Sequence, residues 1–436
     1  MSVPEPGSRR TWSRVPDGAA VRAWTRRRTR RHRRGLWALV GDVYTALFAV
    51  AMSGALTAPH LGRLVPGQQV RLADGTLTGA GADPAWVVLA VLLAALAPLL
   101  PPSPAALVGV GDDCAVLAAP DGRYCVSTDV LVEGRHFRTD WMSAQQVGRR
   151  AAAQNLADVA AMGAVPVALV VGLVLPGDTP VSWVTDLARG LGRACAPLGV
   201  GVVGGDLSSG ESIVVSVTVM GDLRGRHPVL RGGAHDGDLL VHVGNLGCGA
   251  AGLALLEAGY GDADLSGTAA RCRELFRVPC PPLEAGPALA LAGATAMMDV
   301  SDSLVRDADR LARASSVVVQ IDEPDAPGAL DADLALLEPV ALLLAGQGGA
   351  VPGSRTGAVP GSRAGACVGA RPLARTWVLT GGEDHGMLST LPRSSLGHLP
   401  PGARTIGSVH APRPGQAPGV LVAGRAPASM GWDHFH

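Results

Sequence analysis

The chain has 436 residues with 37 basic and 37 acidic side chains, so its formal net charge is zero. Every basic residue is arginine, which excludes a Schiff-base lysine and a phosphate-binding loop of the G-x-x-x-x-G-K-[ST] type. Aromatic residues make up only 3% of the chain, so we expect no platform for stacking nucleic-acid bases and no nucleic-acid partner. Any phosphate chemistry then depends on arginine, backbone N–H groups or metal ions.

The first 107 residues differ from the remainder in charge and hydropathy. Residues 1–34 contain eleven arginines but only Glu5 and Asp17 as acidic residues, which leaves the rest of the chain acidic. Two apolar stretches follow, at 36–56 and 84–104, and each approaches the ~20 residues that span a bilayer. They predict either a two-helix membrane hairpin that returns the body to the cytoplasm, or two buried helices, the first of which could also be a signal-like segment.

From about Ala105, short Val- and Ile-rich segments alternate with Ala-rich helical segments, which predicts an α/β and α+β two-domain fold. A helix is expected over Ala144–Met162, with Ser143 as its N-cap and Gly163 as its stop. We expect one domain at 108–225 and another at 226–436, interrupted by a low-complexity insertion at 346–371. The predicted strands are Tyr124–Ser127, Val167–Leu175, Gly199–Val203, Ile213–Met220 and Asp238–Val243.

The seven cysteines show no C-x-x-C pair, which indicates reduced thiols in a cytoplasmic body. The histidines and cysteines also lack the spacing of zinc ligands, and no G-x-S-x-G nucleophile motif occurs. The chemistry of the body is therefore expected to come from other residues.

Six acidic clusters, each beside small residues, carry the strongest chemical signal. Most are expected where a strand ends or a helix begins, which is where sites are built in such folds. Taken singly, an aspartate at such a place is ordinarily a turn former or helix cap. The clusters are Gly111-Asp112-Asp113, Ser127-Thr128-Asp129, Asn155-Leu156-Ala157-Asp158, Gly204-Gly205-Asp206, Asp299-Val300-Ser301-Asp302 and Gly381-Gly382-Glu383-Asp384.

Six clusters in one acidic body favour a magnesium site over a set of unrelated caps. Converging carboxylates repel one another, and a hard divalent cation with oxygen ligands removes that cost. Magnesium held in this way commonly bridges to substrate phosphates. The predicted reaction class is therefore phosphoryl transfer.

A G-x-G-x-x-G motif at Gly247–Gly252 follows the predicted strand Asp238–Val243. A dinucleotide site would require an acidic residue about 20 positions later, after a second strand, and Asp262 and Asp264 come too early. We therefore interpret the motif as a tight strand-to-helix turn with close packing.

Several motifs follow one another along residues 108–435. They are VGVGDDCAVL from 108, STDVLVEGRHF from 127, AQNLADVAAMGA from 153, VGGD from 203, DVSD from 299, GGED from 381 and GWDHF from 431. In sequence and order they resemble the motifs of the thiamine-monophosphate kinase family. This family is similar to aminoimidazole-ribonucleotide synthetase, so the resemblance implies an N-terminal α/β domain that dimerises through its sheet and an α+β C-terminal domain. The G-E-F-x-L-I-type helix that precedes the first motif in the family is not found in 1–107.

The resemblance implies transfer of the γ-phosphoryl group of ATP to thiamine monophosphate, with several Mg²⁺ ions. Because the acceptor is already an ionised phosphate, no strong general base is needed, and the main obstacle is repulsion between two polyanions. The implied catalytic residues are Asp129, Asp206 and Asp302. The implied magnesium ligands are Asp113, Ser127, Thr128, Asp129, Asp158, Asp206, Asp299 and Asp302. ATP is expected at Gly205, Asp206, Arg231 and Ser301, and thiamine monophosphate at His136, Glu383 and Trp432.

Two other interpretations stay open at this point. One is another enzyme of the same superfamily, such as aminoimidazole-ribonucleotide synthetase, selenophosphate synthetase or the hydrogenase-maturation protein; the His136 motif and the terminal GWDHF favour the thiamine enzyme over these. The other is a membrane-tethered thiamine-phosphate binder without catalysis. An assay with ATP, Mg²⁺ and thiamine monophosphate distinguishes a kinase from such a binder.

Overall fold

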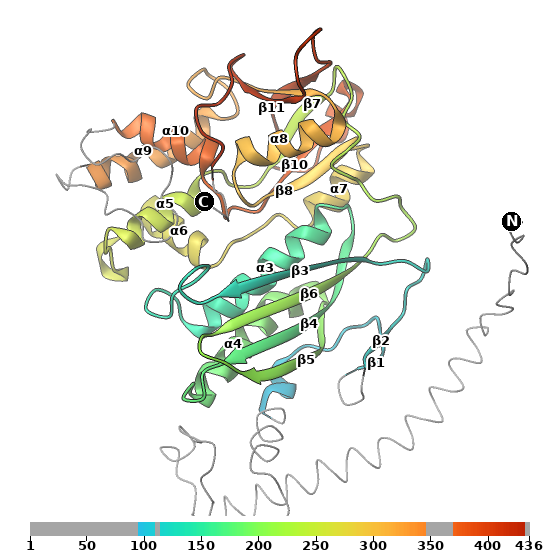
Figure 1. The fold of residues 1–436 in the computed structure, drawn as a ribbon, viewed down its shortest axis with the longest axis vertical. Coiled ribbons are helices and arrows are strands. Elements are labelled where there is room, and N and C mark those ends of the chain that lie inside the picture. Colours follow the sequence, from blue (N-terminus) through green and yellow to red (C-terminus); the bar gives the residue numbers. More distant parts are fainter. Residues whose placement is uncertain (1–94, 110–113, 346–368, 432–436) are drawn as a thin grey trace, which may run out of the picture. The chain divides into compact units, whose positions relative to one another are not determined.

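The computed structural model describes residues 95–109, 114–345 and 369–431, which all belong to one structural unit (Figure 1). The Arg-rich segment, the apolar stretch 36–56, the first half of the stretch 84–104, Asp113, most of the insertion and Trp432 lie outside these residues. No helix within the described ranges is long and apolar enough to cross a membrane.

The first sheet has four strands: β3 (Cys125–Val132), β4 (Val165–Leu175), β5 (Gly201–Ser209) and β6 (Val214–Asp222). Their order is β3-β6-β4-β5, and β4 with β5 is the parallel pair. The helices α3 (Ala144–Ala160) and α4 (Val181–Cys195) cover one face of this sheet (Figure 1). On the other face Val126 is 63% exposed and Val130 is 46% exposed, so no described element covers it there. We call this surface the open face.

Two of these strands are longer than predicted. β3 continues to Val132 and β5 to Ser209, so the Ser127–Asp129 and Gly204–Asp206 motifs lie inside strands and not at their ends. The physical reason is pairing: β3 matches β6 residue by residue from Cys125 to Val132. Backbone hydrogen bonds along this register outweigh the low strand propensity of Asp and Gly. The expectation that these two clusters follow strand ends is therefore wrong.

The second sheet has six strands in the order β12-β9-β11-β7-β10-β8. Every neighbouring pair is antiparallel except β12 with β9. One face shares a core with α5, α8, α9 and α10, and α7 packs on the other. The strands are β7 (Leu239–Val243), β8 (Ala296–Val300), β9 (Val318–Ile321), β10 (Gly386–Leu391), β11 (Arg404–His410) and β12 (Gly419–Val422). The helices are α5 (Cys248–Glu257), α6 (Gly267–Arg277), α7 (Ala285–Leu291), α8 (Leu304–Ser315), α9 (Asp331–Ala345) and α10 (Ala370–Thr380).

Two sheets with separate cores confirm the predicted α/β and α+β class. A two-stranded pair, β1 (Ala106–Val108) with β2 (Val116–Leu117), and the short 3-10 helices η1 (Ala97–Leu99), η2 (Ala196–Leu198), η3 (Asp262–Asp264) and η4 (Arg393–His398) complete the described elements. Because α10 begins at Ala370, the predicted end of the insertion at Arg371 falls inside a helix.

Helix α3 is the element that the two sheets share. Its predicted cap is confirmed: Ser143 accepts from the N–H of Gln146, whose side chain bonds back to Ser143 in a capping box. Val147 and Leu156 lie in the core under the four-stranded sheet, whereas Ala157 and Ala160 lie in the core under the six-stranded sheet. Small side chains are needed here because α7 lies directly on α3; a Cβ on Gly286 would come within 1.9 Å of the Ala160 carbonyl oxygen.

The Gly247–Gly252 motif forms the expected strand-to-helix turn. Gly247 has φ 79° at the N-cap of α5, and a Cβ on Gly252 would meet the Cys272 carbonyl oxygen at 2.2 Å. The N–H groups of Gly247 and Gly249 donate to the carboxylate of Asp384, at 2.6 and 2.9 Å. The amides that could bind a phosphate therefore bind a carboxylate of the chain itself.

Candidate functional site

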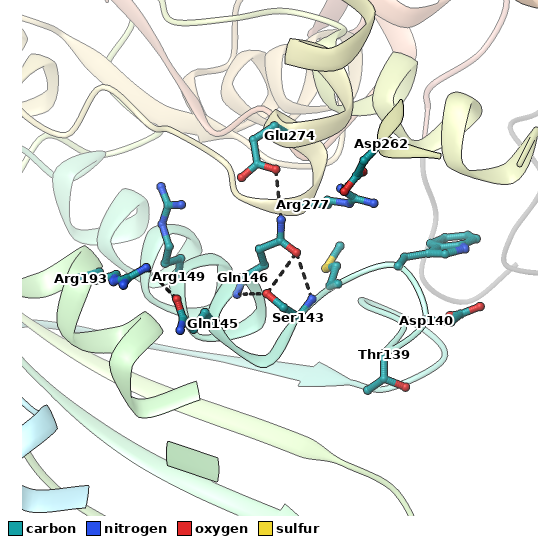
Figure 2. A pocket seen from close by; sticks show the side chains of 12 residues that line it. Thr139, Asp140, Ser143, Gln145, Gln146, Arg149, Arg193, Asp262, Glu274 and Arg277 are labelled. Carbon is teal, nitrogen blue, oxygen red and sulfur yellow. Dashed lines mark hydrogen bonds and ion pairs between the residues drawn. The ribbon is translucent and has the colours of Figure 1, made fainter. Parts of the chain in front are cut away.

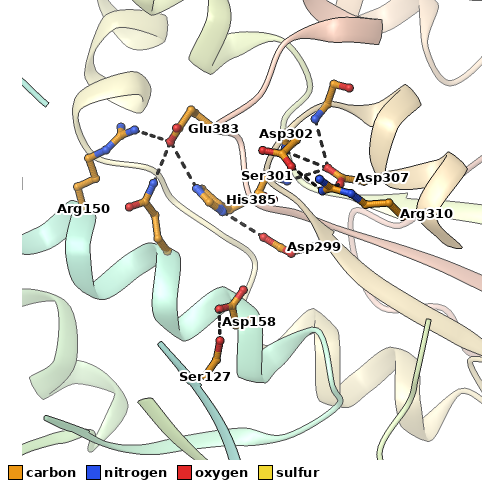
Figure 3. A network of polar contacts seen from close by, with 12 residues as sticks. Ser127, Arg150, Asp158, Asp299, Ser301, Asp302, Asp307, Arg310, Glu383 and His385 are labelled. Atoms are coloured by element: carbon orange, nitrogen blue, oxygen red, sulfur yellow. Dashed lines mark hydrogen bonds and ion pairs between the residues drawn. The ribbon is translucent and has the colours of Figure 1, made fainter. Parts of the chain in front are cut away.

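A polar stripe runs along α3 at intervals of four residues: Gln146, Arg150, Gln154 and Asp158. This spacing places the four side chains on one side of the helix. Arg150 and Gln154 both donate to Oε2 of Glu383, the latter at 2.9 Å, and Arg150 also donates to the Phe276 carbonyl oxygen (Figure 3). Asp158 accepts from the Ser127 hydroxyl at 2.6 Å. The stripe therefore joins β3 to the segment that precedes β10.

Four of the predicted metal ligands come together where the stripe ends. Asp129 projects from β3 on the face that α3 covers, and its backbone N–H donates to Asn155 Oδ1 at 3.1 Å. The charges of Asp299 and Asp302 raise the pKa of Asp129, and the charges of Asp299 and Asp129 raise the pKa of Asp158, so the four carboxyl groups lie close together. Figure 3 shows Asp158, Asp299 and Asp302. Asp299 is 5% exposed and Asp302 8% exposed.

Two carboxyl groups of the cluster have raised pKa values. Burial raises the pKa of Asp158 to about 7, and the charges of Asp299 and Asp129 add to the effect, whereas the charge of His385 opposes it. Burial also raises the pKa of Asp129; the charge of His385 opposes this rise, and the charges of Asp299, Glu383 and Asp302 add to it. No arginine or histidine forms an ion pair with Asp129 or Asp158 in the described part of the chain.

The other carboxylates are paired with cations of the protein. His385 Nδ1 lies 3.2 Å from Asp299 Oδ2, and its Nε2 lies 3.7 Å from Glu383 Oε2. Burial alone would lower the pKa of His385, but the hydrogen bond to Asp299 and the nearby carboxylate of Glu383 outweigh it and raise the pKa to about 10. Burial would raise the pKa of Glu383, but Arg150 and His385 outweigh it and lower the pKa to about 2. Glu383 is therefore ionised and His385 is a cation at neutral pH.

The backbone around Glu383 is strained in a way that is typical of functional sites. Glu383 has φ 72° and His385 has φ 52°, both in the left-handed region that side chains other than glycine rarely occupy. Three hydrogen bonds hold the segment: the Glu383 N–H donates to the Ser301 carbonyl at 2.8 Å, and the Asp384 carboxylate accepts from the turn before α5. The segment is thus built to present two charged side chains to α3.

Two predicted metal residues are not part of this cluster. Side chains alternate along a strand, and the register places Thr128 and Asp206 on the open face, opposite to Asp129. Thr128 donates to the carbonyl oxygen of Val217 at 2.9 Å, and Asp206 accepts from Ser208 at 3.3 Å. Strands β3 and β5 are also the two edges of the sheet, about 14 Å apart. Within one chain, Asp206 therefore lies apart from Asp129.

The remaining predicted residues have mixed positions. Ser301 lies beside the cluster, and its N–H donates to Asp307. His136 contributes to the lowered pKa of Glu383, and its Nδ1 accepts from the Val132 N–H at 2.9 Å. Arg231 is exposed in the segment before β7, where its carbonyl accepts from Ser315, and its side chain contacts none of the cluster.

Gly205 has a structural reason to be glycine whatever it binds. A Cβ at this position would lie 2.1 Å from the Val171 carbonyl oxygen on the neighbouring strand. Its assignment to ATP therefore stays a prediction.

Sequence reasoning missed Arg150, Gln154, His385, Asp307 and Arg310. A signal was present for the first two, because polar residues at intervals of four interrupt a helix that is otherwise rich in buried alanine. His385 directly follows the Gly381–Asp384 motif, and Arg310 lies on the helix after the Asp299–Asp302 motif, but only the tertiary structure shows that they pair with Asp299 and Asp302.

The side chains of the cluster suit magnesium by their chemistry more than by their present arrangement. Among the described residues no three His, Cys, Asp or Glu side chains stand in the arrangement of a metal site. The oxygen donors nevertheless fit a hard cation: carboxylates and the Ser127 hydroxyl lie near Asp129 and Asp158, and these two carboxyl groups keep raised pKa values although the charge of His385 lowers them. A divalent ion would remove the repulsion that raises them.

A separate polar hollow of about 490 Å³ lies at the N-terminal end of α3 (Figure 2). Gln146 crosses it to donate to Glu274 Oε2 at 3.1 Å, and Arg149, Arg193 and Arg277 line it. None of the predicted metal or substrate residues lines this hollow. It lies at the Gln146 end of the stripe, whereas the carboxylate cluster lies at the Asp158 end.

We expect the substitution Arg150→Met to lower the free energy of unfolding by about 2–3 kcal/mol, because it removes a charge that is 1% exposed and leaves Glu383 with fewer partners. Chemical denaturation at neutral pH measures this change. The matched control is Arg149→Met, at an exposed position with no ion pair in the described chain, where the change should stay within about 0.5 kcal/mol. Equal effects of the two substitutions would contradict the role given to Arg150.

Comparisons with known proteins place this geometry in a family. The model of the AIR synthase related protein, N-terminal domain, matches residues 111–223, and that of the AIR synthase related protein, C-terminal domain, matches residues 235–351. Together these matches cover more than half of the chain, and each includes one of the two sheets or a large part of it.

Comparison with individual proteins identifies a narrower family within this group. The chain is 43% identical to the thiamine-monophosphate kinase of Mycobacterium tuberculosis over 303 residues, which cover 70% of this chain and 79% of that protein. It is 39% identical to the thiamine-monophosphate kinase of Corynebacterium glutamicum over 332 residues, covering 74% and 88% of the two chains. The solved structure of AaThiL complexed with AMPPCP and TMP is similar with a TM-score of 0.58 at 27% identity, covering 80% and 96%. Its sequence and its fold together show that the chain belongs to the thiamine-monophosphate kinase family.

Proposed function

We propose that this protein transfers the γ-phosphoryl group of ATP to thiamine monophosphate, giving thiamine diphosphate and ADP. Family membership supports the reaction, and so does the similarity to a structure that holds AMPPCP and TMP. The observation that carries the proposal is the division of charge in the site. Asp299, Asp302 and Glu383 form ion pairs with cations of the protein, whereas Asp129 and Asp158 form none among the described residues and are influenced by the charge of His385 without pairing with it.

Asp129, Asp158, Asp299 and Asp302 would hold Mg²⁺, with the Ser127 hydroxyl beside them. Bound magnesium would supply positive charge against the phosphates of the two substrates. The protein's own part is to hold these carboxylates in place: Asn155 fixes the backbone of Asp129, and Ser127 orients the carboxylate of Asp158. No side chain needs to act as a strong base, because the accepting phosphate oxygen is already ionised.

Glu383 is proposed to contact thiamine monophosphate together with His136. The Glu383 side chain is 34% exposed although Arg150 and Gln154 hold its Oε2, so part of the carboxylate stays accessible. A fixed carboxylate suits the cationic ring of thiamine, and Trp432 is proposed to complete this site.

Asp206 and Thr128 are proposed to act as magnesium ligands on the open face. Gly205, Arg231 and Ser301 are proposed to contact ATP, as is Asp206. Asp206 cannot join Asp129 within one chain, because it lies on the opposite edge and face of the sheet. We therefore infer a homodimer in which a second copy covers the open face. The exposed Val126 and Val130 support this inference.

Membrane association through 36–56 and 84–104 stays a prediction. Of the second stretch, residues 95–104 are described, and there Leu96 is buried in the core under the four-stranded sheet, with Leu99 and Leu100 packed against it. The end of that stretch is therefore part of the folded body.

The kinase reaction is tested with purified full-length protein, Mg²⁺, ATP and thiamine monophosphate. We expect thiamine diphosphate to form, and we expect Glu383→Gln to raise the KM for thiamine monophosphate by about tenfold while the KM for ATP changes little, because only the thiamine side loses a charge. Binding of thiamine monophosphate without any product would support the non-catalytic binder instead. An equal rise in both KM values would remove Glu383 from the thiamine site.

A further inference from the structure

The loop before α8 is organised by one buried carboxylate. Asp307 is 0% exposed, and its Oδ2 accepts from the backbone N–H groups of Ser301, Asp302 and Ser303 at 3.1, 3.0 and 3.2 Å. Three donors on one oxygen fix the position of this carboxylate and, with it, the loop that carries Asp302. Asp307 is thus a stable anchor next to a proposed metal ligand.

Arg310 connects this anchor to Asp302. Its Nη1 lies 2.7 Å from Asp307 Oδ1 and 2.5 Å from Asp302 Oδ2, so one nitrogen bridges two carboxylates (Figure 3). The Asp302 side chain is 11% exposed and has little access to water, so the contact with Arg310 covers an oxygen that a metal ion would need.

The Arg310 side chain has room to leave Asp302. It is 39% exposed and borders a hollow of about 600 Å³ that Arg306, Arg313 and Met430 also line. Because Asp307 is held by backbone donors, it can keep the guanidinium group while Asp302 turns to another cation.

We propose that Arg310 is a built-in counter-cation that occupies Asp302 until a divalent metal ion displaces it. This inference rests on the metal site of the proposed function. Arg310 is a positioning residue: it holds the Asp302 carboxylate in place when no metal is bound, and it competes with the metal for the same oxygen. Repulsion between the incoming ion and the guanidinium group would separate Arg310 from Asp302 and leave it paired with Asp307 alone.

The test measures Mn²⁺ binding by full-length wild type, Arg310→Met and Arg313→Met, with and without a non-hydrolysable ATP analogue, from the electron paramagnetic resonance signal of free Mn²⁺. Without its competitor, Asp302 should bind Mn²⁺ about five- to tenfold more tightly in Arg310→Met. The same variant should unfold at a lower temperature than wild type in chelator, and Mn²⁺ should restore most of the difference. Arg313, three residues along α8, pairs with Asp309 at 2.6 Å and is 66% exposed, so Arg313→Met should match wild type in both measurements.

Unchanged or weaker Mn²⁺ binding by Arg310→Met, with wild-type binding intact, would overturn the inference and leave the proposed metal site standing. Absence of Mn²⁺ binding by the wild type would overturn both. If Arg310→Met does not fold, Arg310→Gln removes the charge but keeps a hydrogen-bond donor, and the same tightening is expected of it.

Discussion

Asp129→Asn should reduce kcat for thiamine diphosphate formation by at least about 100-fold at saturating Mg²⁺, ATP and thiamine monophosphate. Asp129 forms no ion pair in the described chain, and the charge of His385 does not offset the effect of burial on its pKa, so a bound metal is the partner that its charge would serve. The substitution keeps the size of the side chain, and the hydrogen bond from the backbone N–H of residue 129 to Asn155 stays available. The measurement is a steady-state assay of product formation.

The fold should survive this change, because the raised pKa of Asp129 shows that its ionised form is unfavourable in the metal-free protein. Circular dichroism and thermal unfolding check this point. The control is Asp178→Asn, in the exposed loop before α4, which should keep wild-type activity. If Asp129→Asn retained kcat within about threefold of wild type, Asp129 would have to be removed from the metal ligands.

The second large effect concerns stability. Asp158→Asn is expected to raise the free energy of unfolding of the metal-free protein at pH 8 by on the order of 2–4 kcal/mol, because the pKa of Asp158 rises from its ordinary value of 3.8 to about 7 on folding. The same substitution should abolish the stabilisation that Mg²⁺ gives, since it removes a proposed ligand. Activity is thus expected to depend on a charge that costs stability.

The sign of the pH dependence follows from the direction of the shift. The folded protein holds the Asp158 proton up to about pH 7, whereas the unfolded chain releases it near pH 3.8. Between these values the folded state binds more protons, so this group's contribution to stability is present below about pH 4 and is lost as the pH rises to 7. Denaturation between pH 4 and 8 should show a steeper fall for the wild type than for Asp158→Asn.

Asp186→Asn on α4 is the matched control for this pH series. Asp186 is exposed and paired with Arg189 at 2.6 Å, so its substitution should change the free energy of unfolding by less than about 0.5 kcal/mol. If the free energy of unfolding of Asp158→Asn and of Asp186→Asn depended on pH in the same way, the raised pKa assigned to Asp158 would be refuted.

Much of the fold could be predicted from local sequence. The helix after Ser143 begins and ends within two residues of expectation, because a capping box and a following glycine are chemical signals that neighbouring residues carry by themselves. The turn at Gly247–Gly252 was predictable for the same reason. The lengths of β3 and β5 were not, since their ends depend on register with β6 and β4, which are separate in sequence.

The candidate site shows the same division. The sequence by itself determined which acidic motifs the chain has, and the absence of lysine limited the groups that can face a phosphate. Only the tertiary structure decided how these acids are distributed: strand alternation separates Asp206 from Asp129, and the segment before β10 brings His385 against Asp299. These two charges are 86 residues apart in the chain and become neighbours through packing, which local sequence does not record. The neutral net charge of the chain therefore says little about its site, where two carboxylates have raised pKa values and form no ion pair among the described residues.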